Sequence, residues 1–150
     1  MTINIRRATA TDLDAVAPLF DAYRRFYGQS GDLPRARAFL AARLQAGESV
    51  VLLAERDHAA VGFAQLFPMF SSVRTARMWV LNDLYVEAAA RRGGVARGLL
   101  EAAARFARED GAVRIVLETA VDNAAARALY RDVGWREETG QWYALPLDGA

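Results

Sequence analysis

The chain has 150 residues, of which 53% are hydrophobic, and this is enough to build one domain around a sizeable core. Its formal net charge is +1, so charge gives no argument for binding nucleic acid. Cysteine is absent and histidine occurs once, at His58, which excludes a disulfide framework and a thiol nucleophile and disfavours a Ser-His-Asp triad or a histidine metal site.

The first half of the chain predicts a strand, two helices and a β-hairpin. Helical spacing of apolar residues, cap residues and short apolar runs indicate these elements. In chain order they are a strand over 3–7, a helix from a Thr11 cap to Tyr27, a helix from Pro34 to Ala46, hairpin strands over 49–55 and 59–67, and a loop over 68–75. His58 lies in the hairpin turn, where we expect it to be solvated.

The second half predicts a long strand, then a helix, and then a buried strand that runs parallel to the long strand. The elements are strands over 77–86 and 113–117 with a helix over 95–109 between them, a helix over 124–131 capped by Asn123 or Asp122, and closing strands over 135–136 and 141–145. This order predicts an α/β domain whose sheet is mixed and mostly antiparallel. It contains one β-α-β unit around the connection at 91–96.

That connection, Arg91-Arg92-Gly93-Gly94-Val95-Ala96, is the most informative segment of the chain. Its two glycines allow a sharp bend and a close approach of the backbone to a ligand. The helix that follows directs unpaired N–H groups and the positive end of its dipole outward, with Arg91, Arg92 and Arg97 around them. The segment therefore suits a phosphate or pyrophosphate. From the loop alone, a glycine turn with solvated charges is an equal alternative.

The segment resembles the acyl-CoA loop of the GNAT family of N-acetyltransferases, Gln/Arg-x-x-Gly-x-Gly/Ala, with Arg91, Gly94 and Ala96 at the matching positions. Residues 84–86 resemble the splayed strand before that loop. The family's next motif is matched by Asn123, Leu129-Tyr130 and Gly134-Trp135. The resemblance covers nearly the whole chain. It implies a single GNAT-like domain over 1–150, with the sheet splayed around an acyl-CoA-binding β-α-β unit.

The resemblance also implies how acetyl-CoA is bound. Backbone groups of Leu84 and Val86 hold the pantetheine arm and polarise the thioester carbonyl, and backbone N–H groups over 92–97 hold the pyrophosphate. Tyr130 is the implied general acid for the leaving thiolate, with aromatic packing as the alternative. Asn123 binds cofactor amides or serves only as a helix cap. The implied cofactor-binding residues are Leu84, Tyr85, Val86, Arg91, Arg92, Gly93, Gly94, Val95, Ala96, Arg97, Asn123 and Tyr130.

The general base is harder to assign. In the polyamine-acetylating branch, which this strand resembles, a glutamate takes the position of Asn82. Asparagine cannot accept the amine's proton, although it could hold a water that does. Asp83 and Glu118 are the nearest carboxylates, each a base or a partner in a structural salt bridge. Strand alternation sends Asn82 and Asp83 to opposite faces unless a bulge intervenes. The candidate catalytic residues are Tyr130, Asn82 and Glu118.

The acceptor pocket is expected at the end of the first helix, where family members shape it. Tyr23, Tyr27 and Gln29 lie there, Asp83 is a further candidate contact, and residues 67–74 would form the other wall. Aromatic side chains at this place could hold a cationic amine by cation–π contacts. Ordinary core and loop packing is the alternative for each of them.

These features predict an enzyme that moves an acetyl group from acetyl-CoA to a primary amine of a small molecule, peptide or protein by direct attack in a ternary complex. The alternative is a non-catalytic acyl-CoA-binding regulatory domain, which Asn82 leaves open. The chain resembles the small-amine, polyamine and histone side of the family, so we expect a homodimer through residues 141–147. No apolar signal core or membrane span is present, and we expect a cytoplasmic protein without membrane, nucleic-acid or metal partners.

Overall fold

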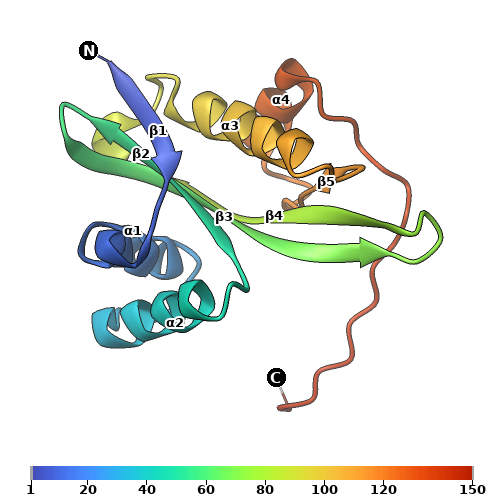
Figure 1. Ribbon diagram of the computed structural model, residues 1–150, viewed down its shortest axis with the longest axis horizontal. Helices are drawn as coiled ribbons and strands as arrows, with labels where there is room; N and C mark the ends of the chain where they lie inside the picture. Colours follow the sequence, from blue (N-terminus) through green and yellow to red (C-terminus); the bar gives the residue numbers. More distant parts are fainter. Residues whose placement is uncertain (1, 150) are drawn as a thin grey trace. The chain divides into compact units, whose positions relative to one another are not determined.

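Five strands form one sheet in the part of the chain up to Glu118 (Figure 1). The computed structural model describes residues 2–149, which fall into one unit up to Glu118 and a second from Thr119 onward. The elements of the first unit are β1 (Ile3–Arg7), η1 (Ala10–Asp12), α1 (Leu13–Phe26), α2 (Leu33–Gln45), β2 (Val50–Arg56), β3 (Ala59–Ser71), β4 (Ala76–Val86), η2 (Ala88–Ala90), α3 (Val95–Glu109) and β5 (Ile115–Val116). The second unit contains α4 (Ala124–Val133).

The sheet has the strand order β1-β2-β3-β4-β5. Strands β1 to β4 are antiparallel neighbours, whereas β5 pairs with β4 in parallel. Helices α1 and α2 cover one face of the sheet and α3 covers the other (Figure 1). Phe20, Leu40 and Phe63 belong to the core between the sheet and the first two helices. The α/β class, the mixed and mostly antiparallel sheet and the parallel pairing of the strand that follows α3 are confirmed. That strand is shorter than the expected 113–117 and is half-buried rather than buried.

The β2–β3 hairpin forms as its sequence predicts. Asp57 and His58 form its two-residue turn with φ values of 50° and 67°. Positive φ at both turn residues matches the right-handed twist of the flanking strands. His58 is exposed in this turn, as expected.

The β3–β4 hairpin is longer than the sequence predicts. The expected loop over 68–75 is wrong, because β3 continues through Pro68 to Ser71 and leaves only residues 72–75 between the strands. Pro68 lies opposite Trp79, and the Trp79 N–H donates to Arg114 on the β5 side. Opposite residues of an antiparallel pair either both face each other or both face away, so the proline nitrogen faces away from β4. On that side β2 ends its pairing at Leu66. No strand hydrogen bond is therefore lost at Pro68.

The entry into α1 differs from the expected Thr11 cap. Thr9 caps the 3₁₀ turn η1, where its N–H donates to the Asp12 carboxylate at 2.8 Å, and the cap residue of α1 itself is Asp12. The 3₁₀ turn of η1 then precedes α1. Arg6 binds the same carboxylate at 2.8 Å and holds Asp12 in place, so that α1 begins one residue later than a Thr11 cap would give.

The Arg6–Asp12 pair predicts a loss of stability in acid. The hydrogen bond from Arg6 lowers the pKa of Asp12 from 3.8 to about 2. Because the pKa is lower in the folded chain, the stabilisation is present above pH 4 and is lost as the pH falls toward 2. We expect Asp12→Asn to lower the Tm at pH 6 and to lower it by a smaller amount at pH 2.5, in thermal unfolding followed by circular dichroism.

The matched control is Asp14→Asn, because the Asp14 side chain is 92% exposed in its pair with Arg37. Exposed pairs contribute little, so this variant should unfold like the parent at every pH. A Tm deficit of Asp12→Asn that stays constant from pH 2.5 to pH 6 would contradict the role of its charge.

The C-terminal part corrects the last predicted elements. Helix α4 is capped by Asn123, whose side chain accepts the Ala126 N–H at 3.2 Å, and Gly134 ends it with φ 106°. The closing strands expected over 135–136 and 141–145 are wrong, since residues 135–149 contain no strand. The second unit has no other strand with which these segments could pair, so their backbone groups lack a ladder partner within it. Among residues 2–149, no helix is both long and apolar enough to cross a membrane.

Candidate active site

One edge of β4 is unpaired over its last residues. Strand β5 pairs with β4 only opposite Trp79 and Val80. Further along, the Glu87 N–H donates to the Val61 carbonyl of β3 at 2.9 Å. Because backbone groups alternate between the two sides of a strand, those of residues 84 and 86 face away from β3. The backbone groups of these two residues therefore have no strand partner on that side of β4.

A β-bulge in β4 brings two polar side chains together. Gln65 lies opposite Asp83 and Leu66 lies opposite Leu81, so Asn82 is an extra residue in β4. In a regular strand, neighbours point to opposite faces. Here Asn82 Nδ2 donates to Asp83 Oδ1 at 3.0 Å, and both residues line one pocket.

Asp83 is a buried carboxylate without a cationic partner. It is 5% exposed, and Gln65 Nε2 donates to its Oδ2 at 2.7 Å. Burial raises the pKa of Asp83 above its ordinary value, while hydrogen bonds from Gln65, Tyr23 and Asn82 act in the opposite direction. None of the ion pairs among residues 2–149 involves it, so the salt-bridge alternative does not describe Asp83. A carboxylate with a raised pKa in a pocket is suited to accept a proton.

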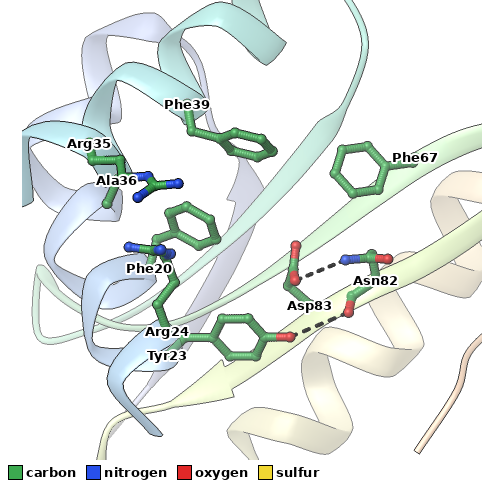
Figure 2. Close-up of a pocket in the computed structure, with 9 residues that line it drawn as sticks. All are labelled: Phe20, Tyr23, Arg24, Arg35, Ala36, Phe39, Phe67, Asn82 and Asp83. Atoms are coloured by element: carbon green, nitrogen blue, oxygen red, sulfur yellow. Dashed lines mark hydrogen bonds between the residues drawn. The ribbon is translucent and has the colours of Figure 1, made fainter. Parts of the chain in front are cut away.

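The pocket beside Asp83 has a volume of about 340 Å³ and lies between the helices α1 and α2 and the sheet (Figure 2). The residues that line it are Phe20, Tyr23, Arg24, Arg35, Ala36, Phe39, Phe67, Asn82 and Asp83. Tyr23, Phe67 and Asp83 lie where the sequence led us to expect an acceptor. Tyr27 and Gln29 do not line the pocket, and the Tyr27 ring packs against Tyr23 at 5.0 Å instead.

Five lining residues were missed from the sequence: Phe20, Arg24, Arg35, Ala36 and Phe39. The available signal was helical spacing. Phe20 and Arg24 are four residues apart on α1, and Arg35 and Phe39 are four apart on α2, so each pair shares one helix face. Spacing alone does not say that the two faces meet over one pocket.

The glycine connection forms the N-terminus of α3. Gly94 is its cap residue with φ 82°, and a Cβ at this position would meet no atom within 4 Å. The Gly98 N–H closes the first helical hydrogen bond, on the Gly94 carbonyl, at 3.0 Å. The backbone N–H groups of 95–97 therefore precede the helical ladder and are available to an anion.

Two arginines, Arg91 and Arg56, lie against the backbone of this connection and of the strand end before it. Arg91 Nε donates to the Val86 carbonyl at 2.9 Å, and its guanidinium lies 5.7 Å from the Tyr85 ring centre. Arg56, from the end of β2, lies so close to Gly93 that a Cβ there would collide with its guanidinium. Arg56 Nε is also buried without a hydrogen-bond partner. Sequence reasoning missed Arg56, because only the folded hairpin brings β2 to this connection.

The remaining predicted site residues lie elsewhere. Glu118 is exposed after β5 and does not line the pocket. Asn123 and Tyr130 belong to the second unit, in which Asn123 caps α4 and the Tyr130 ring lies 6.4 Å from that of Trp135. Residues 2–149 contain no group of three or more histidine, aspartate or glutamate side chains that could hold a metal ion.

Comparisons with known proteins agree on one family. The model of the acetyltransferase (GNAT) family matches residues 16–135. The uncharacterized N-acetyltransferase YhfO of Bacillus subtilis (strain 168) is 48% identical over 138 residues, 92% of this chain and 93% of that protein. A crystal structure of a probable acetyltransferase has a TM-score of 0.92 at 44% identity, over 98% of this chain and 99% of that chain.

A predicted acetyltransferase from Clostridium acetobutylicum, solved with acetyl-CoA, has a TM-score of 0.78 at 20% identity and covers 97% of this chain and 97% of that chain. At this identity the likeness is one of fold.

Proposed function

Because the chain belongs to the acetyltransferase (GNAT) family and is an acetyltransferase, we propose a specific reaction for it. In this reaction an acetyl group moves from acetyl-CoA to the primary amine of a small molecule, peptide or protein. One observation carries the proposal. Strand β4 offers an unpaired backbone edge at Leu84 and Val86, and directly before it the buried carboxylate of Asp83 lines a pocket. The donor and the acceptor can therefore approach the same strand.

The donor site is proposed on the α3 N-terminus and the β4 edge. The N–H groups of 95–97 would receive the pyrophosphate, and the buried, unpartnered Nε of Arg56 supports an anion there. The pantetheine arm would bind the backbone of Leu84 and Val86 like an added strand. It would compete with Arg91 for the Val86 carbonyl. Bound in this way, acetyl-CoA supplies an activated acetyl thioester.

The acceptor's proton is proposed to pass to Asp83, directly or through a water held by Asn82. An alkyl amine is mostly protonated at neutral pH, because its pKa is near 10, and only the deprotonated amine attacks a thioester. Asp83 lines the pocket and its pKa is raised, whereas Glu118 lies outside the pocket. These observations favour Asp83 over Glu118 as the base, with Asn82 in a positioning role.

Tyr130 is proposed as the general acid that protonates the departing thiolate, on the strength of the motif that it shares with the family. We expect Tyr130→Phe to bind acetyl-CoA normally and to lower kcat by about 100-fold. Isothermal titration measures the binding, and release of the CoA thiol measures kcat. Turnover by Tyr130→Phe within threefold of the parent would return Tyr130 to a packing role.

An assay of thioester cleavage tests the function itself. CoA thiol release is followed with acetyl-CoA alone and with a panel of primary amines. The proposed enzyme releases CoA faster with at least one amine, and the amine gains the mass of one acetyl group. Binding of acetyl-CoA without amine-dependent release would instead favour a non-catalytic acyl-CoA-binding domain.

We also propose that residues 1–150 act as a single domain and that the protein forms a homodimer through residues 141–147. The family match spans both units, which supports the first point. The second is supported by Trp142, Tyr143, Leu145 and Leu147, which are 81% to 92% exposed. Apolar side chains gathered in one exposed segment are typical of a contact surface.

A further inference from the structure

Two arginines of the acceptor pocket have no anionic partner. Arg24 Nη1 is buried without a hydrogen-bond partner, and no ion pair among residues 2–149 involves Arg24 or Arg35. The nearby carboxylates are engaged elsewhere. Asp21 pairs with Arg25 at 3.5 Å and accepts the Asp32 N–H at 2.8 Å, and Asp32 caps α2 by accepting the Arg35 N–H at 3.1 Å. The pocket thus contains positive charge that the fold does not neutralise.

This arrangement is unfavourable in the empty pocket. A buried guanidinium nitrogen without an acceptor loses its hydration and gains nothing in return. Arg35 lies in the first turn of α2, where the helix dipole already contributes positive charge and a cation is disfavoured. An anionic group bound by Arg24 and Arg35 would give the buried Arg24 nitrogen an acceptor and would neutralise the positive charge at the start of α2, through charge-assisted hydrogen bonds.

The pocket has opposite charges at its two ends. In Figure 2 the guanidinium groups of Arg24 and Arg35 lie on the side of α1 and α2, whereas Asp83 and Asn82 lie on β4. The rings of Phe20, Tyr23, Phe39 and Phe67 also line the pocket. An occupant that fits it has an amine at one end, a negative group at the other and an apolar spacer between them.

We propose that the acceptor is a small amino acid whose amine and carboxylate are separated by an apolar spacer, with the carboxylate bound by Arg24 and Arg35 and the amine directed to Asp83. This rests on the proposed function and narrows its acceptor. A carboxylate accepts parallel hydrogen bonds from guanidinium groups, and a pocket of about 340 Å³ has the size of a small-molecule site. A polyamine would place a second cation against the two arginines, so polyamines are disfavoured.

Three amines of equal chain length test the proposal. They are 6-aminohexanoate, hexylamine and 1,6-diaminohexane, which differ only in the charge of the far end. We expect the parent to acetylate 6-aminohexanoate with a kcat/KM at least tenfold above that of hexylamine, with the diamine lowest. Arg24→Gln and Arg35→Gln should remove this advantage, so that the kcat/KM for 6-aminohexanoate falls to that of hexylamine in the same variant. Arg35→Glu should reverse the order and favour the diamine.

Arg37→Gln is the matched control, because Arg37 lies on α2 outside the pocket and pairs with Asp14 at 2.8 Å. It should keep the order of the parent. Arg35 is exposed, so its variants are expected to fold even if Arg24→Gln does not. Equal rates on the three amines, or an unchanged order in Arg35→Gln and Arg35→Glu, would overturn the proposal and leave the acetyltransferase function standing.

A calorimetric titration with 6-aminohexanoate in the presence of CoA separates the two proposals when no amine is turned over. Binding that Arg35→Gln abolishes would support the carboxylate site and count against the proposed function. The absence of such binding would overturn the carboxylate site.

Discussion

Replacing Asp83 with asparagine is expected to lower kcat/KM by about 100-fold to 10,000-fold, the range of a lost general base. Asparagine has the same shape but cannot accept the amine's proton. Its amide can be accommodated, because Gln65 Oε1 is buried without a partner and could accept a hydrogen bond after a flip of the Gln65 side chain. The pocket should therefore keep its form while losing its base.

The pH dependence distinguishes a base from a structural residue. The base acts when deprotonated, so the rate of the parent should rise with pH through the raised pKa of Asp83. This acid limb should be absent in Asp83→Asn. Whereas Asp83→Asn should lower the rate, it should not lower the thermal stability of the folded chain. A carboxyl whose pKa is raised by folding destabilises the folded chain once the pH exceeds its ordinary value, so Asp83→Asn is expected to have an equal or higher Tm at pH 7.

Glu118→Gln is the control for Asp83, because it removes the other candidate carboxylate from an exposed position. It should retain the rate and the pH profile of the parent. If Glu118→Gln loses the acid limb while Asp83→Asn keeps it, Glu118 is the base and the assignment made from the pocket is wrong.

Replacing Gly94 with valine is expected to weaken the binding of acetyl-CoA by about 100-fold or more. The open space beside Gly94 is where a pyrophosphate would approach the N–H groups of α3, and a branched side chain would fill it. Loss of two charge-assisted hydrogen bonds, at about 1.5–3 kcal/mol each, is sufficient for this effect. Isothermal titration with acetyl-CoA measures it.

Gly111→Val controls for backbone strain. Gly111 has the same φ of 82°, also with no atom within 4 Å of an added Cβ, but it follows the opposite end of α3. Both variants should lose stability through the left-handed backbone, at about 1–2 kcal/mol, but only Gly94→Val should lose affinity. Similar losses of affinity in both variants would mean that the α3 N-terminus acts through folding and not through contact with the ligand.

Local signals in the sequence predicted much of the fold. The Asp57-His58 turn, the Asn123 cap and the glycine at the start of α3 are each decided by residues close in the chain. The same is true of the strand and helix order, because hydrophobic spacing and breaker residues set it. These features also identified the family.

What the sequence did not predict depends on residues distant in the chain. The continuation of β3 through Pro68 depends on where β2 ends, and Arg56 reaches Gly93 only once the hairpin has formed. The bulge at Asn82 is fixed by the register of β3 against β4, so Asp83 could not be placed beside Asn82 with certainty. Arg24 and Arg35 meet at one pocket because two helices pack on one sheet face.

The unpaired edge of β4 has an evolutionary consequence. In the proposed donor site the ligand is held by the main chain, so packing, and not donor recognition, decides which side chains residues 84 and 86 can carry. The bulge places Asn82 and Asp83, which face the pocket, directly before these positions. If the donor binds as proposed, descendants of such a protein can exchange one acceptor for another by changing side chains of the pocket, while inheriting the donor site.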